Sequence, residues 1–338
     1  MARKPTTLEA LLKLLTAEMQ SAFLAAIQGV VDQVVLQQII DAVAAGDADR
    51  AFELLGFNPA ALRPLTAAIE RIYERSGNWT AEGYPRQPGY PVFRFNVRAP
   101  DAEKWVKDKS SELVTRLTDD VRTNIRSTLE DGVQRGVNPR NTALDIVGRI
   151  NRQTGKREGG LVGLSVPQET WVRSFRTNLE QLDEGYFKKA LRDKRFDGTV
   201  RKAIDSGKPL PRDVIDKLVS RYRDNALKYR GEMIARTESI HAFNVAELES
   251  AKQVLATGAV RQKDIIREWD SAGDRRVRPA HKLMDGQRVG LDEPFRAPDG
   301  SLLMYPGDTT LGAPGKETIN CRCRVKTTID WIGAQVGD

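Results

Sequence analysis

The spacing of apolar residues changes once along this chain, and that change limits the folds it can adopt. Near the start, apolar residues recur at steps of three and four, which predicts a long helix with one apolar face. They are Leu8, Leu12, Leu15, Met19, Phe23, Ile27, Val30, Val31 and Val34. Helical spacing continues, with interruptions, to about Gly258. Most of the chain is therefore expected to be helical.

The last eighty residues follow a different pattern. Short strand-like runs alternate with the turn sequences Asp285-Gly286, Asp299-Gly300 and Pro306-Gly307-Asp308. The runs are 265–269, 287–290, 302–305 and 324–329. We therefore predict a mainly α protein, in which helical N-terminal and middle regions are followed by a small α+β C-terminal module.

The length of 338 residues exceeds the usual size of one hydrophobic core, so several units are expected. Gly46-Asp47 should end the first helix, and a helix capped at Asn58-Pro59 should run to about Arg75. Prolines and glycines are dense from 76 to 100, and the glycines of 152–163 predict a mobile connector. The expected regions are a partner-binding helical region 1–76, a linker or arm 77–100, a helical middle region 101–230, and the module 231–338.

Positive charge is concentrated in one segment. Residues 186–236 hold 15 Lys or Arg against 7 Asp or Glu, whereas residues 1–78 hold 7 against 9. Such an excess is typical of a surface that contacts a polyanion, although solvated helix faces carry similar charge. The candidates for DNA contact are Lys188, Lys189, Arg192, Lys194, Arg195, Arg201, Lys202, Arg221 and Arg223. Because they follow no recognition motif, any DNA contact should be non-specific and sensitive to salt.

The sequence gives no sign of export or of a membrane partner. Its start lacks the pattern of a secretory signal, and polar residues interrupt the apolar stretch 21–45 too often for a bilayer span. Cys321 and Cys323 lie one residue apart, which suits a reducing cytosol better than a disulfide framework. The long apolar face from Leu8 to Val35 instead suggests a surface for a protein partner.

An ordered series of residues in the second half of the chain resembles a known family. Arg236-Thr-Glu238 precedes Asn244 on an expected helix, and the series ends at Asn320-Cys-Arg-Cys323. Its members are Arg236, Glu238, Asn244, Trp269, Asp274, Arg278, His281, Asp285, Gly286, Asn320, Cys321 and Cys323. In this order they resemble the signature of the phage Mu protein F-like minor head proteins, and the resemblance extends over about residues 100–330.

That resemblance implies a structural role in a bacteriophage. Members of the family are minor capsid components that associate with the portal and affect head assembly or genome delivery. The resemblance therefore implies a non-enzymatic virion protein without a cofactor, located in the capsid interior after assembly in the host cytoplasm. Its expected partners are the phage portal protein, the inner capsid surface and packaged double-stranded DNA, and the N-terminal helices are the expected portal contact.

The motif residues also have a physical interpretation. Arg236 and Asn244 are eight residues apart and share a helix face, from which they can hold the following loops by hydrogen bonds. The arginine-rich segment from Asp274 to His281 fits an ion-paired loop or a phosphate contact equally well. The sequence contains no nucleophile elbow, P-loop, His-Glu-x-x-His or dinucleotide fingerprint. We therefore assign no catalytic residue.

Two other functions remain open at this stage. The first is a phage-borne enzyme, a nuclease or a transferase, built around His281, Asp274 and Glu238 of the C-terminal module. The second is a helical DNA-binding protein of the host, which would place all of its affinity for DNA in the basic segment.

The two cysteines and His281 are the chain's candidate soft metal ligands. Structural zinc needs four ligands, usually with cysteines two to four residues apart, so the Cys-x-Cys pair is a poor match and no metal is expected. Instead, alternation along a strand should point both thiols to one face as small buried groups, with Asn320 and Arg322 facing the loops around Asp274 and His281.

Overall fold

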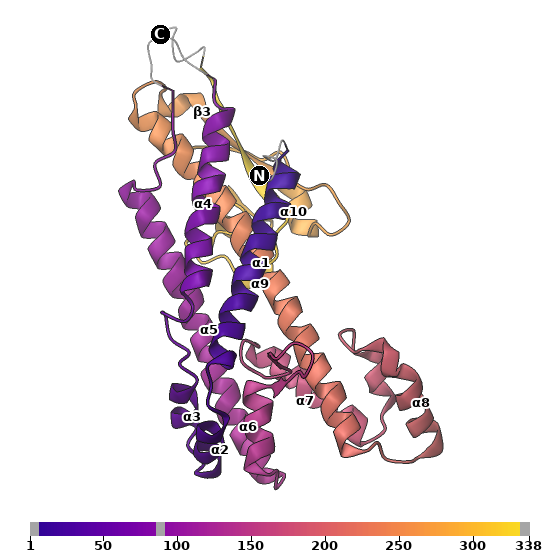
Figure 1. The fold of residues 1–338 in the computed structure, drawn as a ribbon. Coiled ribbons are helices and arrows are strands. Elements are labelled where there is room, and N and C mark those ends of the chain that lie inside the picture. The colour runs from indigo at the N-terminus through magenta and orange to yellow at the C-terminus, as the bar shows by residue number, and fades with distance from the viewer. Residues whose placement is uncertain (1–6, 86–91, 332–338) are drawn as a thin grey trace. The chain divides into compact units, whose positions relative to one another are not determined.

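The structure is a computed structural model that describes residues 7–85 and 92–331. It is mainly helical, and its strands lie chiefly near the C-terminus, which confirms the predicted class (Figure 1). The α-helices are α1 Leu8–Asp32, α2 Leu36–Ala44, α3 Ala48–Leu54, α4 Arg63–Gly83, α5 Pro100–Gln134, α6 Pro139–Val147, α7 Val166–Glu180, α8 Asp197–Ser206, α9 Arg212–Ala256, α10 Pro279–Leu283 and α11 Gly315–Thr318. Short 3-10 helices are η1 Glu184–Lys188, η2 Lys194–Phe196 and η3 Gln262–Asp264.

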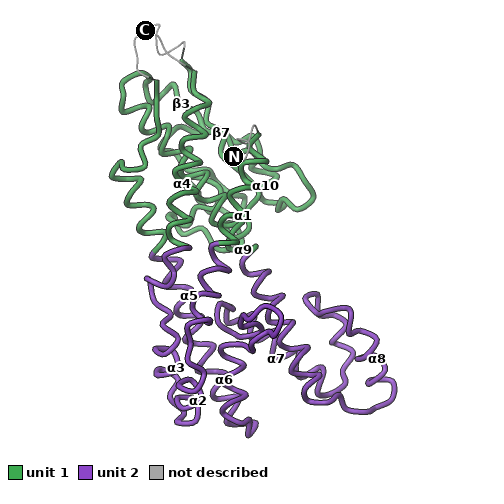
Figure 2. The backbone as a smooth tube through the Cα atoms, viewed as in Figure 1, with its two compact units in different colours: residues 1–21, 65–110, 232–338 green, residues 22–64, 111–231 purple. Residues whose placement is uncertain are grey.

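The chain divides into two compact units, and neither is one continuous stretch of sequence (Figure 2). Unit 1 consists of residues 1–21, 65–110 and 232–338, and unit 2 of residues 22–64 and 111–231. The divisions fall within the helices α1, α4, α5 and α9. The four consecutive regions expected from the sequence therefore differ from the observed units, and only the junction near residue 231 agrees.

The N-terminal apolar stripe is mostly buried. The single helix expected up to Gly46 is two helices, because α1 ends at Asp32 and α2 begins at Leu36. Leu15, Met19 and Phe23 are fully buried within the chain. Most of the stripe is therefore core, whereas Leu8 and Leu12 are half-buried and line a groove, so the described residues do not show the continuous exposed apolar face from which we predicted a partner surface. By length and composition alone α1 is also apolar enough to cross a membrane, a test that core helices of soluble proteins pass as well.

Helix α4 continues to Gly83, past the predicted end at Arg75 and into the expected linker. Gly77, which the sequence analysis took as a helix breaker, lies inside the helix. A Cβ atom at this position would lie 2.3 Å from the ring of Phe95, so glycine allows that ring to rest on the helix backbone. Phe95 also meets the ring of Tyr73 edge-on, with centroids 5.5 Å apart. Residues 86–91 of the expected linker lie outside the described residues.

In unit 2, the expected mobile connector 152–163 is partly ordered structure. Strands β1 Arg149–Ile150 and β2 Arg157–Glu158 pair antiparallel, and Leu161 and Val162 behind them are buried. A cluster of buried side chains joins α7, α8 and the first part of α9. Within it, Phe175 stacks on Tyr222 with 4.3 Å between ring centroids. This cluster is the core beneath the basic segment.

The C-terminal module of unit 1 contains a three-stranded antiparallel sheet in the order β4-β3-β7. Strands β3 Ile265–Ser271, β4 Arg288–Gly290 and β7 Cys323–Ile329 match three of the four predicted runs. The fourth is shorter than predicted, since β6 Leu302–Leu303 pairs with β5 Phe295–Arg296, which we did not predict. Each residue of β3 lies opposite a residue of β7, from Ile265 with Ile329 to Ser271 with Cys323.

Candidate functional site

Two neighbouring residues on α9, Arg236 and Thr237, hold the turn that contains Asn320. The Arg236 guanidinium donates to the Asn320 side-chain oxygen at 2.9 Å, and the Asn320 backbone N–H donates to the Thr237 hydroxyl at 3.0 Å. Asn320 has φ +56°, a left-handed conformation that asparagine tolerates better than most residues. These contacts hold the turn that leads into β7.

Asn244 joins three segments of the module. Its fully buried amide donates to the Pro306 carbonyl at 3.0 Å and to the Cys323 carbonyl at 3.4 Å. Its oxygen accepts from the Val325 backbone N–H at 2.9 Å. One helix side chain thus hydrogen-bonds both the Pro306-Gly307-Asp308 turn and strand β7.

Glu238 and His241 lie deeper in unit 1. Glu238 is buried and forms an ion pair with Lys109 of α5 at 3.3 Å. His241 lies 3.3 Å from the Tyr305 hydroxyl, and burial, together with the charge of Lys109, holds the pKa of this histidine well below its ordinary value. Glu238 therefore has a partner on α5, and His241 has a partner in the segment that contains Tyr305.

The loop residues of the motif contact backbone or ion-pair partners. Asp274 pairs with Arg322, as the strand alternation predicted, and Arg278 donates to the Ile319 carbonyl. Asp285 accepts from the Ser271 backbone N–H at 2.7 Å, and Gly286, at φ +77°, donates to the Trp269 carbonyl at 2.8 Å. The motif is thus a network of contacts around the sheet.

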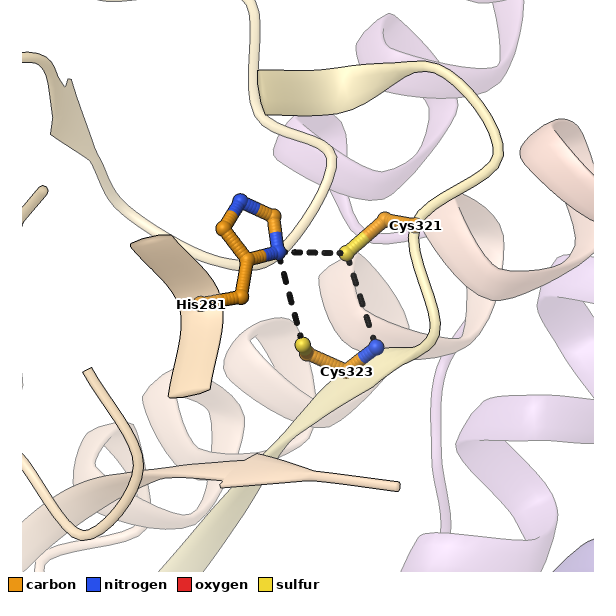
Figure 3. A group of neighbouring side chains, drawn as sticks. All are labelled: His281, Cys321 and Cys323. Atoms are coloured by element: carbon orange, nitrogen blue, oxygen red, sulfur yellow. Dashed lines mark hydrogen bonds between the residues drawn. The ribbon is translucent and has the colours of Figure 1, made fainter. Parts of the chain in front are cut away.

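The structure brings His281, Cys321 and Cys323 together, although about forty residues separate the histidine from the cysteines (Figure 3). His281 lies on α10, Cys321 in the turn before β7, and Cys323 at the first position of β7; all three are buried. The His281 Nδ1 atom lies 3.5 Å from each sulfur, and its Nε2 atom lies 2.9 Å from the Glu317 carboxylate.

The two thiols are electrostatically unlike. A hydrogen bond from Cys323, aided by His281, holds the pKa of Cys321 well below its ordinary value. The same hydrogen bond and burial raise the pKa of Cys323. Burial disfavours a charged His281, but its contacts with Cys321 outweigh burial and raise the pKa of this imidazole. Cys321 is therefore the sulfur that most readily becomes a thiolate.

Both cysteines line an open groove of about 1060 Å³ in unit 1. One wall is the Leu8 to Gln20 face of α1, and the other includes Asp270 to Asp274 and the segment Cys321 to Arg324. Both cysteines are among the lining residues of this groove, although little of either side chain is exposed.

The residues of the alternative enzyme do not form one site. Glu238 pairs with Lys109, Asp274 with Arg322, and His281 with the cysteines and Glu317. Each of the three thus has an ion-pair partner outside this set of three. The geometry gives no catalytic arrangement of the kind that this alternative requires.

The basic segment of unit 2 is extensively ion-paired. Arg192 pairs with Asp197 at 3.0 Å, Arg195 with Asp193 at 2.7 Å, and Arg201 with Glu184 at 2.7 Å. Lys189 donates to the Ser174 hydroxyl at 2.7 Å, and Arg221 lies 3.6 Å from Asp193. Lys188, Lys194, Arg195, Arg201 and Lys202 are exposed.

Arg223 is the exception, and it corrects the predicted DNA-contact set. Its side chain is 4% exposed and lies 2.7 Å from Glu169 and 3.1 Å from Asp145. A guanidinium buried between two carboxylates is not available to a phosphate. The helical spacing of the sequence did not reveal which face of α9 this residue occupies.

Four of the other DNA-contact candidates line a cavity of about 550 Å³ in unit 2. Arg192, Lys194, Arg195 and Arg221 are joined there by Arg157 and Lys228, which the sequence analysis did not single out. Three acids, Glu158, Asp193 and Asp224, also line it, so the six cations are in excess. Burial raises the pKa of Asp224 to about 6, which brings it close to losing its charge near neutral pH.

Sequence reasoning missed two residues that stabilise the module. Glu317 holds His281, and Arg267 of β3 is fully buried and donates to the Gly290, Glu293 and Met304 carbonyls. An arginine within a strand of alternating pattern was the available signal for Arg267. Glu317 had no signal, because its partner lies 36 residues away.

Comparison with known proteins gives two findings. Residues 194–326 match the family model described as Phage Mu protein F like protein. The chain is also similar to Minor head protein GP7 of Bacillus phage SPP1, with 29% identity over 101 residues, which is 30% of this chain and 30% of that protein. The alignment thus spans less than a third of that relative's length. No solved structure matches the chain.

Proposed function

We propose that this chain, whose residues 194–326 match the family model described as Phage Mu protein F like protein, acts as a minor head protein in bacteriophage head morphogenesis. The observation that carries the proposal is the family match, which covers most of the basic segment and nearly the whole C-terminal module. Within the virion, the protein associates with the portal and the packaged DNA at the inner capsid surface and assists assembly and genome delivery.

The geometry of the module supports a structural role. Arg236, Asn244 and Asp285 make their hydrogen bonds with backbone or side-chain groups of the same module. The candidate enzyme residues have separate partners, so the nuclease or transferase alternative is not favoured. Portal association now rests on the family resemblance alone, because the N-terminal stripe that first suggested it is mostly buried.

DNA contact is proposed at the cavity of unit 2. Its lining cations come from β2, from η2 and the segment just before it, and from α9, which gathers charges that are far apart in sequence. Because this lining is not a recognition helix with base-reading side chains, contact would be with phosphates. Such binding weakens steeply as salt rises, since each contact releases counterions from the DNA.

Mass spectrometry of purified phage particles tests the location. The proposal expects peptides of this chain in full heads, at few copies per particle. Comparing full heads with particles that have released their DNA shows whether the chain leaves with the genome. Absence of its peptides from full heads would remove the virion role.

A charge reversal tests the DNA surface. Lys194→Glu with Arg195→Glu should weaken duplex binding for all sequences alike and reduce the slope of log affinity against log salt by about two contacts. The matched control is Lys107→Glu with Arg140→Glu, which changes the same charge at exposed positions outside the cavity. Equal loss in both variants would mean that only overall charge matters.

A further inference from the structure

The strongest unassigned feature is the cluster of His281, Cys321 and Cys323. It presents one imidazole nitrogen and two sulfurs, the ligand types that zinc prefers in proteins. These atoms all lie within 4.8 Å of one another, and the three residues are almost completely buried. They come from two separate elements, α10 and the start of β7, so the fold has brought them together from distant positions.

The distances fit a metal centre. Tetrahedral zinc has bonds of about 2.3 Å to sulfur and about 2.1 Å to nitrogen, which places those two atoms about 3.6 Å apart. The observed separation between His281 Nδ1 and each sulfur is 3.5 Å. A zinc ion therefore fits among these atoms without displacing α10 or β7.

The surroundings of the imidazole also match a metal ligand. Metal-bound histidines commonly use the second ring nitrogen to donate to a carboxylate, which fixes the ring and strengthens its basicity. Here His281 Nε2 lies 2.9 Å from Glu317, which is itself buried on α11. With Nε2 next to Glu317, the other ring nitrogen, Nδ1, is the one that faces both sulfurs, as Figure 3 shows.

Further contacts fix the same atoms. The Cys323 backbone N–H donates to the Cys321 sulfur at 3.5 Å, a contact that favours a thiolate. The edge of Trp269 packs against the His281 ring, with centroids 5.2 Å apart. The imidazole is therefore fixed by a carboxylate on one side and by an aromatic ring on another.

We propose that His281 Nδ1, Cys321 Sγ and Cys323 Sγ bind one Zn²⁺, with the fourth coordination position open to the groove that both cysteines line. Among the residues described, no further histidine, cysteine or carboxylate joins the group. A set of two cysteines and one histidine with a fourth non-protein ligand is a known zinc arrangement. In this chain the ion would cross-link α10 to the start of β7.

The sequence favoured packed thiols over a metal site, and this proposal reverses that preference. Cysteine spacing alone suggested a pair of packed thiols, because a four-ligand structural site was the standard of comparison. The structure confirms that both thiols are buried, but it places a positioned imidazole nitrogen between them.

The first test is elemental analysis of the full-length chain, purified without a histidine tag and desalted into metal-free buffer. We expect about one zinc per chain. Replacement by Co²⁺ should give sulfur-to-cobalt charge-transfer absorption together with the visible bands of a tetrahedral site. A chain that holds no zinc as purified and develops no such absorption with Co²⁺ would overturn the proposal.

Variants then separate metal binding from folding. Cys321→Ser with Cys323→Ser should lose the zinc, whereas His241→Gln, which changes the other histidine, should keep it. Glu317→Ala retains all three ligands and should weaken zinc affinity roughly 10- to 100-fold. Zinc that persists in the cysteine variant, or an affinity unchanged in Glu317→Ala, would contradict the assigned site.

The wild-type thiols offer a readout that does not depend on any variant folding. Under reducing conditions, both should react slowly with a thiol reagent until a zinc chelator is added, and then rapidly. Two thiols that react at the same rate with and without chelator would count against zinc, as would a Cys321–Cys323 disulfide isolated from reducing cytosol.

Discussion

The C-terminal module uses several arginines to bind oxygens of turns and strand ends in addition to ion pairs such as Arg322 with Asp274, whereas carboxylates are the main partners of arginine in the basic segment. In the module, Arg236, Arg267 and Arg278 donate to amide or carbonyl oxygens of turns and strand ends. In the basic segment, Arg192 and Arg195 pair with nearby aspartates. The module has short strands and many turns, so guanidinium groups there satisfy carbonyls that a larger sheet would satisfy itself. In the basic segment, counting cations overstates the charge that is available to a partner.

The largest effect is expected from Arg223→Met, which removes a buried cation of the basic segment. Glu169 would remain buried without its 2.7 Å partner, and Asp145 would lose a partner at 3.1 Å. Breaking a buried pair in this way costs about 3–5 kcal/mol of the free energy of unfolding. Urea unfolding measures the loss.

Arg221→Met is the matched control for that change. Arg221 is 43% exposed and lies 3.6 Å from Asp193, so its loss should cost under about 1 kcal/mol. Arg223→Met could instead keep the wild-type free energy of unfolding and reduce the salt dependence of DNA binding. Arg223 would then be a DNA contact, and the distinction between buried and available cations would be wrong.

In the module, Asn244→Ala should destabilise unit 1 by about 2–6 kcal/mol. The substitution leaves the Pro306 carbonyl and the Val325 N–H without their buried partner, and each unsatisfied group costs about 1–3 kcal/mol. Thermal unfolding of Asn244→Ala and of Lys252→Ala, an exposed change on the same helix, gives the comparison. Equal midpoints would show that Asn244 does not hold the turn and β7 together.

A smaller, pH-dependent effect is expected from Glu247, which accepts from the Thr327 N–H at 2.7 Å. Burial raises the pKa of Glu247 from its ordinary 4.5 to about 7, while Arg324 opposes the rise and Asp270 adds to it. The folded protein therefore keeps this proton more tightly than the unfolded chain does. The resulting stability is fully present below about pH 4.5 and is lost as pH rises through about 7.

Glu247→Gln should flatten this dependence, which we expect to amount to about 1–3 kcal/mol. Unfolding free energies from pH 4.5 to 8 are measured for both proteins, and the difference is used because Asp224 of unit 2, with a pKa of about 6, contributes in the same direction. A difference that stays constant over this range would show that Glu247 titrates normally.

Local patterns predicted the elements that depend on neighbours in sequence. Strand-like runs between turn sequences located β3, β4 and β7, and Asp47, expected at a helix boundary, caps α3 by accepting from the Arg50 N–H at 2.8 Å. Gly77 was misread because a glycine needed for contact with Phe95 has the same sequence signature as one that ends a helix. Whether this glycine ends the helix or packs within it depends on Phe95, which lies eighteen positions away in sequence.

The candidate site was predicted as a set of residues but not as a geometry. The motif order named His281 and both cysteines, whereas the 3.5 Å separations and the role of Glu317 arise from tertiary packing. Arg223 shows the opposite kind of error. Its residue type predicted a DNA contact, but its carboxylate partners hold it in the core. The sequence gives the chemistry of each residue directly, whereas the burial of that residue depends on contacts with distant parts of the chain.

The interleaving of the units has a consequence for how the chain emerges from the ribosome. All residues of unit 2 have been synthesised once position 231 is reached, whereas unit 1 combines residues 1–21 with residues 232–338. Leu15 and Met19, which are fully buried at the end, therefore wait through more than two hundred further residues for their final neighbours. An apolar segment in that position is open to aggregation or chaperone capture during synthesis. A chain truncated at position 231 and released from the ribosome should accordingly protect unit 2 from protease while residues 1–21 are still cleaved.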